Sequence, residues 1–322
     1  MSDFLYVNYK EGKLDEQVKL FIMDLAKNES VPLSLQKPDE VRKNSSILNW
    51  ILKKEEAFKI QNISIIGKNG TIPLRIYSPK GNGPFPVIIY FHGGRWVFGT
   101  LDEADHICNA FSNEIPAIVV SVDYRLSPEY KCPIAIEDGY DALLWTEKTI
   151  RNHKGNANHI AVVGESAGAN IATVISQISR DKKGPKIAYQ LLICPVTNLT
   201  SFDSDSYTKF GNGIWLSKKN MEYYTDQYLR NRIQAEDPYI SPLLTYSLKN
   251  LPPAHIITAE FDVLRDDGEE YAKRLSEAGN VVTHKRYSGM IHSFIILNKV
   301  INRANDAIDD CISLLQTNLQ HE

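Results

Sequence analysis

Several common features are scarce in this chain, and each scarcity argues against a class of protein. The 322 residues carry a formal net charge of −3 and contain no long basic run, so we do not expect a nucleic-acid partner. Residues 1–20 mix acids and lysines without an apolar core, which argues against a secretory signal and a membrane-spanning segment. No long apolar surface run is evident either, and we expect no stable membrane association.

Cysteine is also rare, and its spacing does not suit a metal site. The four cysteines are Cys108, Cys132, Cys194 and Cys311, and no two of them form a Cys-x-x-Cys pair. We interpret them as buried or incidental thiols in a reducing cytoplasm. We therefore expect a cytoplasmic protein with no bound metal.

The hydrophobic content is high enough for a full core, since 43% of the residues are hydrophobic. A chain of this length suits one large α/β domain with insertions better than two independent domains. Strand patterns near residues 58–66, 72–77 and 86–91 precede helical patterns near 101–113 and 134–151. This succession of strands and helices indicates the α/β class.

One serine stands at an abrupt change of hydrophobic period. The β-branched run before it is typical of a buried parallel strand, and apolar residues recur at helical spacing after it, at Ile171, Val174, Ile175 and Ile178. Ser166 therefore lies on a strand-to-helix turn with the pattern Gly-x-Ser-x-Gly. Such a sharp turn strains the serine backbone and leaves no room for neighbouring side chains, which explains the glycines. The pentapeptide alone also fits an ordinary serine in a tight turn.

A reactive serine needs a base, and the base needs a carboxylate that fixes its tautomer. Residues 254–260 have a strand pattern, and Asp262 comes just after its expected end. A second strand pattern at 281–287 leads into a loop that holds His292, ahead of a long C-terminal helix. Ser166, Asp262 and His292 are therefore our candidates for nucleophile, orienting acid and base.

Other histidines and acids compete with these candidates. His159, His255 and His284 fall in strand patterns, and His106 and His153 in helix or loop positions. Asp266 and Asp267 suit the amino terminus of a helix over residues 268–278, where negative charge is favoured. The stronger rival to Asp262 is Glu260, two residues earlier at the same strand end.

A glycine-rich loop could supply backbone donors for a developing oxyanion. The apolar run 86–91 has the character of a strand buried on both faces, and it leads directly into His92-Gly93-Gly94-Arg95. Glycines let the main chain approach a reacting carbonyl and direct N–H groups at it, together with the N–H of Ala167 after the serine. Glycines in a loop are common, so the argument depends on this loop's place upstream of Ser166.

With these motifs, the chain resembles the hormone-sensitive-lipase branch of the α/β-hydrolases, a family of carboxylesterases. The matching stretches, in family order, are residues 92–94, 123–129, 135–139, 164–170, 262–268 and 290–294. The resemblance implies an eight-stranded, mostly parallel sheet flanked by helices, with a helical cap. It implies a triad of Ser166, His292 and Asp262, and an oxyanion hole from the amides of Gly94, Arg95 and Ala167, with His92 and Gly93 in the supporting loop.

Arg95 departs from the family, which usually carries glycine or another small residue there. Arginine keeps the N–H but loses the freedom of glycine to adopt positive φ. In one interpretation, residue 95 has an ordinary backbone conformation and its guanidinium binds a carboxylate such as Glu103 or Asp105. In the other, the loop is displaced and activity is weak, in which case Arg95→Gly would raise kcat.

The resemblance also divides the chain. It implies N-terminal cap helices over residues 1–55, a catalytic core over 56–194 and 243–322, and a second cap segment over 195–242. Helical patterns at 15–27 and 38–54 agree with the first of these. Our candidates for the substrate pocket are Trp96, Phe210, Ile214 and Trp215.

We therefore expect a serine carboxylesterase that hydrolyses short-to-medium acyl esters through an acyl-enzyme intermediate, without a cofactor. Two alternatives stay open at this stage. The same residues could act as a deacetylase or amidase on a specific small metabolite, because fold and triad do not fix the substrate. The chain could also be a ligand-binding relative, weakly active because of Arg95. The expected partner is a small-molecule ester, and the oligomeric state stays open, a homodimer included.

Overall fold

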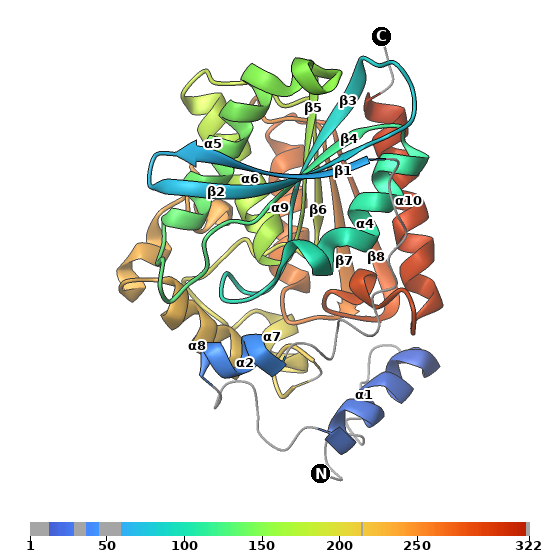
Figure 1. The fold of residues 1–322 in the computed structure, drawn as a ribbon. Helices are drawn as coiled ribbons and strands as arrows, with labels where there is room; N and C mark the ends of the chain where they lie inside the picture. Colours follow the sequence, from blue (N-terminus) through green and yellow to red (C-terminus); the bar gives the residue numbers. More distant parts are fainter. Residues whose placement is uncertain (1–12, 29–36, 45–58, 214, 320–322) are drawn as a thin grey trace.

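The computed structural model describes residues 13–28, 37–44, 59–213 and 215–319, and the expected eight-stranded sheet is present (Figure 1). The strand order is β1-β2-β4-β3-β5-β6-β7-β8. The strands are β1 (Lys59–Gly67), β2 (Gly70–Ser78), β3 (Phe85–Phe91), β4 (Ile118–Val122), β5 (Gly155–Glu165), β6 (Tyr189–Ile193), β7 (Ala254–Phe261) and β8 (Val282–Ile291). The pairs β1–β2 and β2–β4 are antiparallel and the other five pairs are parallel, so the expectation of a mostly parallel sheet is confirmed.

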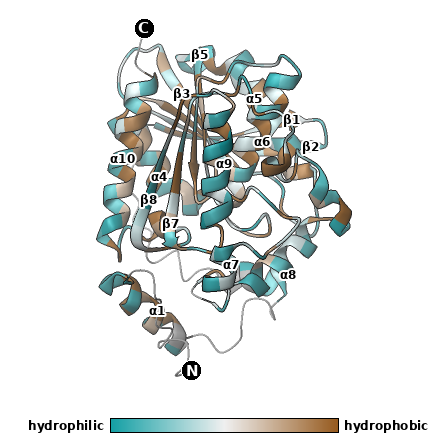
Figure 2. Cartoon of the chain, turned by 180° about the vertical axis from the view of Figure 1, so that it is seen from behind, coloured by the Kyte–Doolittle hydropathy of each residue, from teal (hydrophilic) through white to brown (hydrophobic). Residues whose placement is uncertain are grey.

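Helices cover both faces of the sheet. The helices of the sheet region are α4 (Leu101–Glu114), α5 (Ile134–Thr149), α6 (Ala167–Asp181), α9 (Arg265–Glu277) and α10 (Asn302–Leu319). Helices α4 and α10 lie on one face, and α5, α6 and α9 lie on the other (Figures 1 and 2). The helix surfaces that point away from the sheet are mainly hydrophilic in Figure 2, as expected for amphipathic helices packed on a core.

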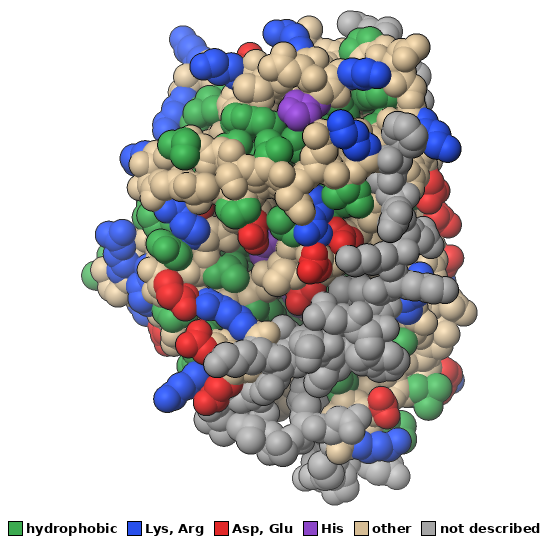
Figure 3. Space-filling model, in the orientation of Figure 1, with side chains coloured by type: hydrophobic (Ala, Val, Ile, Leu, Met, Phe, Trp, Pro, Cys, Tyr) green, Lys and Arg blue, Asp and Glu red, His purple; other side chains and the backbone are tan. Residues whose placement is uncertain are grey.

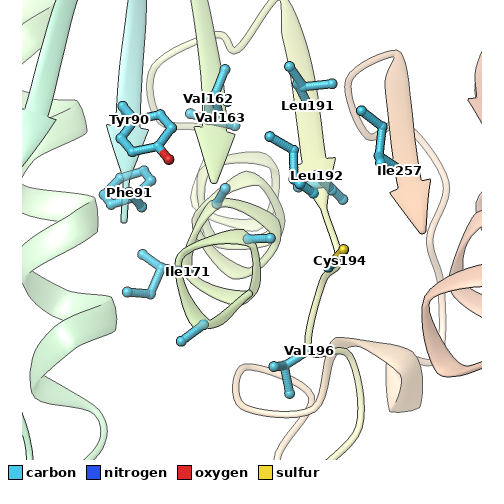
Figure 4. Packing of buried hydrophobic residues seen from close by; sticks show 14 of the residues in the cluster. Tyr90, Phe91, Val162, Val163, Ile171, Leu191, Leu192, Cys194, Val196 and Ile257 are labelled. Carbon is cyan, nitrogen blue, oxygen red and sulfur yellow. The ribbon is translucent and has the colours of Figure 1, made fainter. Parts of the chain in front are cut away.

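The core is continuous through the central strands. Every residue of β4 and β6 is buried, because helices shield both of their faces from water. Figure 4 shows Phe91 at the end of β3, with Ile171 of α6 below it, and Val163 on β5 and Leu192 on β6, which belong to the same buried cluster. This packing fixes the strand ends from which the loops of interest begin.

Four further helices lie beyond the carboxyl ends of the parallel strands: α1 (Glu16–Asn28), α2 (Pro38–Asn44), α7 (Asp205–Phe210) and α8 (Lys218–Tyr228) (Figure 1). Phe21 of α1 meets Trp215 edge to face, with ring centroids 5.3 Å apart. The amino-terminal helix and the segment after β6 are therefore in contact. Residues 45–54, the second half of the second helix predicted near the amino terminus, lie outside the described residues.

Short 3₁₀ turns complete the described chain, as η3 (Ile150–His153), η4 (Arg232–Glu236), η5 (Pro242–Leu244) and η6 (Phe294–Leu297). Within the described residues, no helix combines the length and the apolar character needed to cross a bilayer. Acidic and basic side chains are intermixed on the face shown in Figure 3, in line with the small net charge.

Candidate active site

The strand-to-helix turn predicted at Ser166 is present between β5 and α6. Ser166 has φ 55° and ψ −116°, a strained conformation for a residue with a side chain. A Cβ at Gly164 would lie 2.2 Å from the Gly168 carbonyl oxygen, and one at Gly168 would lie 2.0 Å from the Phe91 carbonyl oxygen. Both flanking glycines are therefore required by space, as the sequence pattern indicated.

Ser166, His292 and Asp262 form one hydrogen-bonded chain. The Ser166 hydroxyl lies 2.9 Å from His292 Nε2, and His292 Nδ1 lies 2.7 Å from Asp262 Oδ2. The other carboxylate oxygen of Asp262 accepts from the Leu264 N–H at 3.0 Å. A carboxylate can only accept, so Nδ1 carries the proton and the lone pair of Nε2 faces the serine. This arrangement can remove a proton from the Ser166 hydroxyl.

The sheet topology explains how distant residues meet. Ser166, Asp262 and His292 each follow directly on the last residue of β5, β7 and β8. These strands are parallel and lie on the same side of the sheet order, with only β6 between β5 and β7. Their carboxyl ends therefore open at one edge of the sheet, where ligands of α/β folds bind.

The rival acids and histidines have other partners. Glu260 accepts from the Gly289 N–H at 2.7 Å, and Asp266 accepts from the Ser206 N–H at 2.7 Å. His255 Nδ1 lies 2.6 Å from the Thr283 hydroxyl, and His284 Nε2 lies 2.9 Å from the Thr258 hydroxyl. None of these side chains is part of the hydrogen-bonded chain at Ser166.

The loop after β3 is held by its own histidine. His92 stacks on Tyr124 with ring centroids 4.3 Å apart, and the Tyr124 hydroxyl donates to the His92 carbonyl at 2.8 Å. Burial lowers the pKa of His92 to about 4, so the ring is neutral near pH 7, and its Nδ1 donates to the Gly93 carbonyl at 2.6 Å. His92 is thus a structural support of the loop. Gly94 has φ 112°, which a side chain would disfavour.

Arg95 does not have the ordinary backbone that one interpretation of the sequence predicted. Its φ is 55°, in the left-handed region. Its guanidinium carbon lies 5.2 Å from the ring centroid of Phe98 and 5.3 Å from that of Tyr224. The predicted partner Asp105 instead binds Arg75 at 2.6 Å. The prediction of an ordinary backbone at residue 95 was therefore wrong. The guanidinium contacts the rings of Phe98 in its own loop and of Tyr224 in α8.

Glu165, whose role the sequence left open, contacts each part of this site. Its buried Oε1 accepts a hydrogen bond from Ser293, the residue after His292. A Cβ at Gly93 would lie 1.7 Å from Glu165 Oε2, so the carboxyl group lies directly against the glycine loop. Burial raises the pKa of Glu165, although His292, Ser293 and Arg95 act in the opposite direction.

Cys194, at the end of β6, is a neighbour that the sequence analysis treated as incidental. Potential ligand atoms of Cys194, Asp262 and His292 all lie within 4.8 Å of one another. His292 and Asp262 are hydrogen-bonded to each other, and burial raises the pKa of the Cys194 thiol well above its usual value. We interpret the thiol as a buried packing neighbour of the Asp262 carboxyl group.

Five of the ten described residues other than glycine that have positive φ lie at this edge of the sheet. Arg95, Trp96, Ser166, Cys194 and Ser293 all have φ between 46° and 60°. Such conformations persist only where the surroundings determine them, and they cluster at functional sites. Strain thus marks the same place as the hydrogen-bonded chain.

The predicted pocket residues lie in different surroundings. Trp96 is buried and stacks on Tyr228, and Phe210 is buried against Phe261 with ring centroids 5.5 Å apart. Trp215 is partly buried and contacts α1, and Ile214 lies outside the described residues. The pocket assignment of these four residues stays a prediction.

Comparisons with known proteins agree with this geometry. A family model described as the alpha/beta hydrolase fold matches residues 88–296. The chain is 38% identical over 266 residues to Carboxylic ester hydrolase LipN of Mycobacterium tuberculosis, covering 81% of this chain and 70% of LipN. It is 30% identical over 298 residues to Ethyl acetate hydrolase of Pseudomonas putida, covering 90% of this chain and 93% of that relative.

A solved structure gives the same result. The hyperthermophilic esterase of the archaeon Pyrobaculum calidifontis matches with a TM-score of 0.91 and 34% identity, covering 95% of this chain and 98% of that one. Similarity extends along nearly the whole of both chains, far beyond the serine turn. The chain belongs to the hormone-sensitive-lipase-like carboxylesterases of the α/β-hydrolase family.

Proposed function

We propose that this chain hydrolyses short-to-medium acyl esters, with Ser166 as nucleophile, His292 as general base and acid, and Asp262 as orienting carboxylate. The observation that carries the proposal is the hydrogen-bonded chain from the Ser166 hydroxyl through His292 to Asp262, at 2.9 and 2.7 Å. The name of the Pseudomonas relative, ethyl acetate hydrolase, supports a short acyl group.

In the first half of the reaction, Ser166 Oγ attacks the ester carbonyl carbon while its proton passes to His292 Nε2. Asp262 stabilises the resulting imidazolium and keeps the ring oriented. The new Oγ–carbon bond gives a tetrahedral intermediate with a negative oxygen. His292 then gives the proton to the alcohol oxygen as its bond to carbon breaks, leaving an acyl group on Ser166.

The negative oxygen is assigned to the backbone N–H groups of Gly94, Arg95 and Ala167. Ala167 is the first residue of α6, so the positive end of the helix dipole faces the same point. Donors already fixed in position stabilise the charge without rearrangement, and one such donor is typically worth about 100- to 1,000-fold in kcat.

In the second half, water replaces the alcohol. His292 removes a proton from the water as its oxygen attacks the acyl carbon, and then returns the proton to Ser166 Oγ as the ester bond breaks. The acid is released and the starting state is restored. Every proton transfer in this cycle involves His292.

We further propose that the N-terminal segment over residues 1–55 and the segment 195–242 form a cap over this site. The contact between Phe21 and Trp215 supports a joint unit. A cytoplasmic location is also proposed, and the four buried, unpaired cysteines support it. An exposed edge strand, β8, would be available for a homodimer.

The test is hydrolysis of a p-nitrophenyl ester series from acetate to dodecanoate by wild-type protein and by Ser166→Ala. We expect the highest kcat/KM at short acyl chains and loss of nearly all turnover in the variant. A variant that keeps most of its activity would contradict the assignment of Ser166. A preference for the matching acyl p-nitroanilides over the p-nitrophenyl esters would instead favour an amidase.

A further inference from the structure

The loop proposed to supply two oxyanion donors contains two consecutive residues in an unfavourable conformation. Arg95 and Trp96 have φ of 55° and 60°, although neither is glycine. A bulky residue in the left-handed region needs neighbours that hold it there. The question is which part of the molecule does so.

Both residues are held by aromatic rings of a single helix, α8. The Trp96 ring lies parallel to that of Tyr228, with centroids 4.1 Å apart and an interplanar angle of 6°. The Arg95 guanidinium lies 5.3 Å from the centroid of Tyr224. Tyr224 and Tyr228 are four residues apart and so lie on one face of the helix, one turn from each other. Two successive loop residues therefore contact two successive turns of α8.

The carboxyl end of α8 is itself tied to the body of the protein. Lys131 Nζ donates to the carbonyls of Asp226, Gln227 and Leu229 at 2.8–2.9 Å. The Cys132 N–H donates to the Tyr228 carbonyl at 2.8 Å. These bonds satisfy carbonyls that a helix leaves without partners at its end.

The same stretch of chain also binds the loop. The Ser127 N–H donates to the Trp96 carbonyl at 2.8 Å, four residues before Lys131. Trp96, Tyr224 and Tyr228 are all buried, so water does not compete for these contacts. The Gly94–Trp96 loop, helix α8 and residues 127–132 are thus connected to one another by these contacts.

We propose that Tyr224 and Tyr228 are positioning residues of the esterase, which hold the Gly94–Trp96 loop so that its amides point at the oxyanion. The proposal rests on the proposed function of Ser166 and of this loop. We expect Tyr228 to have the larger effect on the loop, because a parallel ring stack fixes both the position and the tilt of the Trp96 ring. Tyr224 acts through the Arg95 guanidinium.

The inference has a kinetic signature, because oxyanion contacts form only as the tetrahedral intermediate develops. Loss of the Tyr228 ring is expected to lower kcat by about 10- to 100-fold with little change in KM. A purely structural role would lower stability and leave the kcat of the folded fraction unchanged.

The test compares Tyr228→Leu with Tyr228→Phe, which keeps the ring, and with Tyr271→Leu, a buried tyrosine of α9 outside the site. For each variant, kcat and KM on p-nitrophenyl butyrate and the inhibition constant of a trifluoromethyl ketone are measured, with thermal unfolding as a check of folding. The ketone forms a tetrahedral oxyanion on the serine.

We expect Tyr228→Leu to weaken ketone binding by the same factor as it lowers kcat/KM, while Tyr228→Phe and Tyr271→Leu stay close to wild type. An unchanged kcat and ketone affinity in folded Tyr228→Leu would overturn the inference. If the proposed function itself is wrong, the result is different: the Ser166→Ala variant keeps its esterase activity. If Tyr228→Leu does not fold, the same measurements are made on Tyr224→Leu, for which we expect a smaller loss of kcat.

Discussion

Ser293 donates a hydrogen bond to the buried carboxyl group of Glu165. This contact adds a second link, beside the Ser166–His292 hydrogen bond, between the segment that carries His292 and the serine turn. Each of the two residues is the sequence neighbour of a proposed catalytic residue, Ser293 after His292 and Glu165 before Ser166. The same carboxyl group lies against Gly93. Glu165 is therefore placed to fix the relative positions of three segments: the serine turn, the segment after His292 and the glycine loop at Gly93.

Replacement of Glu165 tests this role. In Glu165→Ala, the Ser293 hydroxyl loses its partner and a space opens beneath the glycine loop, so we expect kcat to fall by about 10- to 100-fold through misplacement of the reacting groups. Glu165→Gln keeps an oxygen for Ser293 and is expected to retain most of the activity. Steady-state kinetics on p-nitrophenyl butyrate measures both. Equal losses in the two variants would indicate a need for the negative charge.

The glycines of the serine turn give a second prediction. Gly168→Ala would place a Cβ 2.0 Å from the Phe91 carbonyl oxygen, which forces the turn away from β3. We expect at least about a 100-fold loss of kcat/KM in the protein that folds. Gly279→Ala is the matched control, since its φ is 88° but no atom lies within 4 Å of the added carbon. The control should lose some stability and keep full activity; normal activity in Gly168→Ala would argue against a rigid turn.

Arg95 gives a third prediction that separates two accounts of the loop. Glycine at this position accepts the left-handed backbone but removes the contact with Tyr224, so we expect Arg95→Gly to lower kcat by about 2- to 10-fold, the size of a cation–π contact. If the arginine displaces the loop, the same variant becomes faster. The direction of the change in kcat, measured with folded protein, decides between them.

Asp267 gives a prediction about stability and pH. Burial raises the pKa of Asp267 from 3.8 to about 7, because the charged form is poorly solvated and Asp266 lies nearby. The folded protein thus holds this proton more tightly than the unfolded chain. The stabilising effect is complete below about pH 4 and is lost as the pH rises through about 7.

Asp267→Asn removes this pH dependence without changing the shape of the side chain. Its unfolding free energy at pH 8 is expected to exceed that of wild type by on the order of 4 kcal/mol, with little difference at pH 4, since the pKa rises from 3.8 to about 7 and one pKa unit corresponds to about 1.4 kcal/mol. Urea unfolding at the two pH values measures the difference. If the difference in unfolding free energy between variant and wild type is the same at both pH values, Asp267 does not titrate in this range.

Local patterns in the sequence predicted individual strands, helices and the turn at Ser166, and the family resemblance implied the eight-stranded sheet and the triad. An apolar run with glycines after it predicts a strand and a sharp turn, and the resemblance gave the order in which Ser166, Asp262 and His292 follow. The structure places these three side chains in one chain of hydrogen bonds. Parallel strands bring their carboxyl ends to one edge, so residues after different strands meet there.

The contacts of side chains between distant segments could not be predicted in this way. The contact of Arg95 with Tyr224 is an example, because Tyr224 comes from a helix more than 120 residues later. No local pattern indicates that α8 lies over this loop. The partner of Glu165 was equally hidden, since a buried acid beside a serine has no periodic signal and Ser293 is 128 positions away.

The central claim is that Ser166 is the nucleophile, and covalent labelling tests it most directly. The wild-type protein and Ser166→Ala are treated with a fluorophosphonate ester, and peptide mass spectrometry locates the added group. We predict one adduct, on Ser166, with parallel loss of esterase activity, and no adduct in Ser166→Ala. An adduct at another residue, or full activity with Ser166 modified, would contradict the claim.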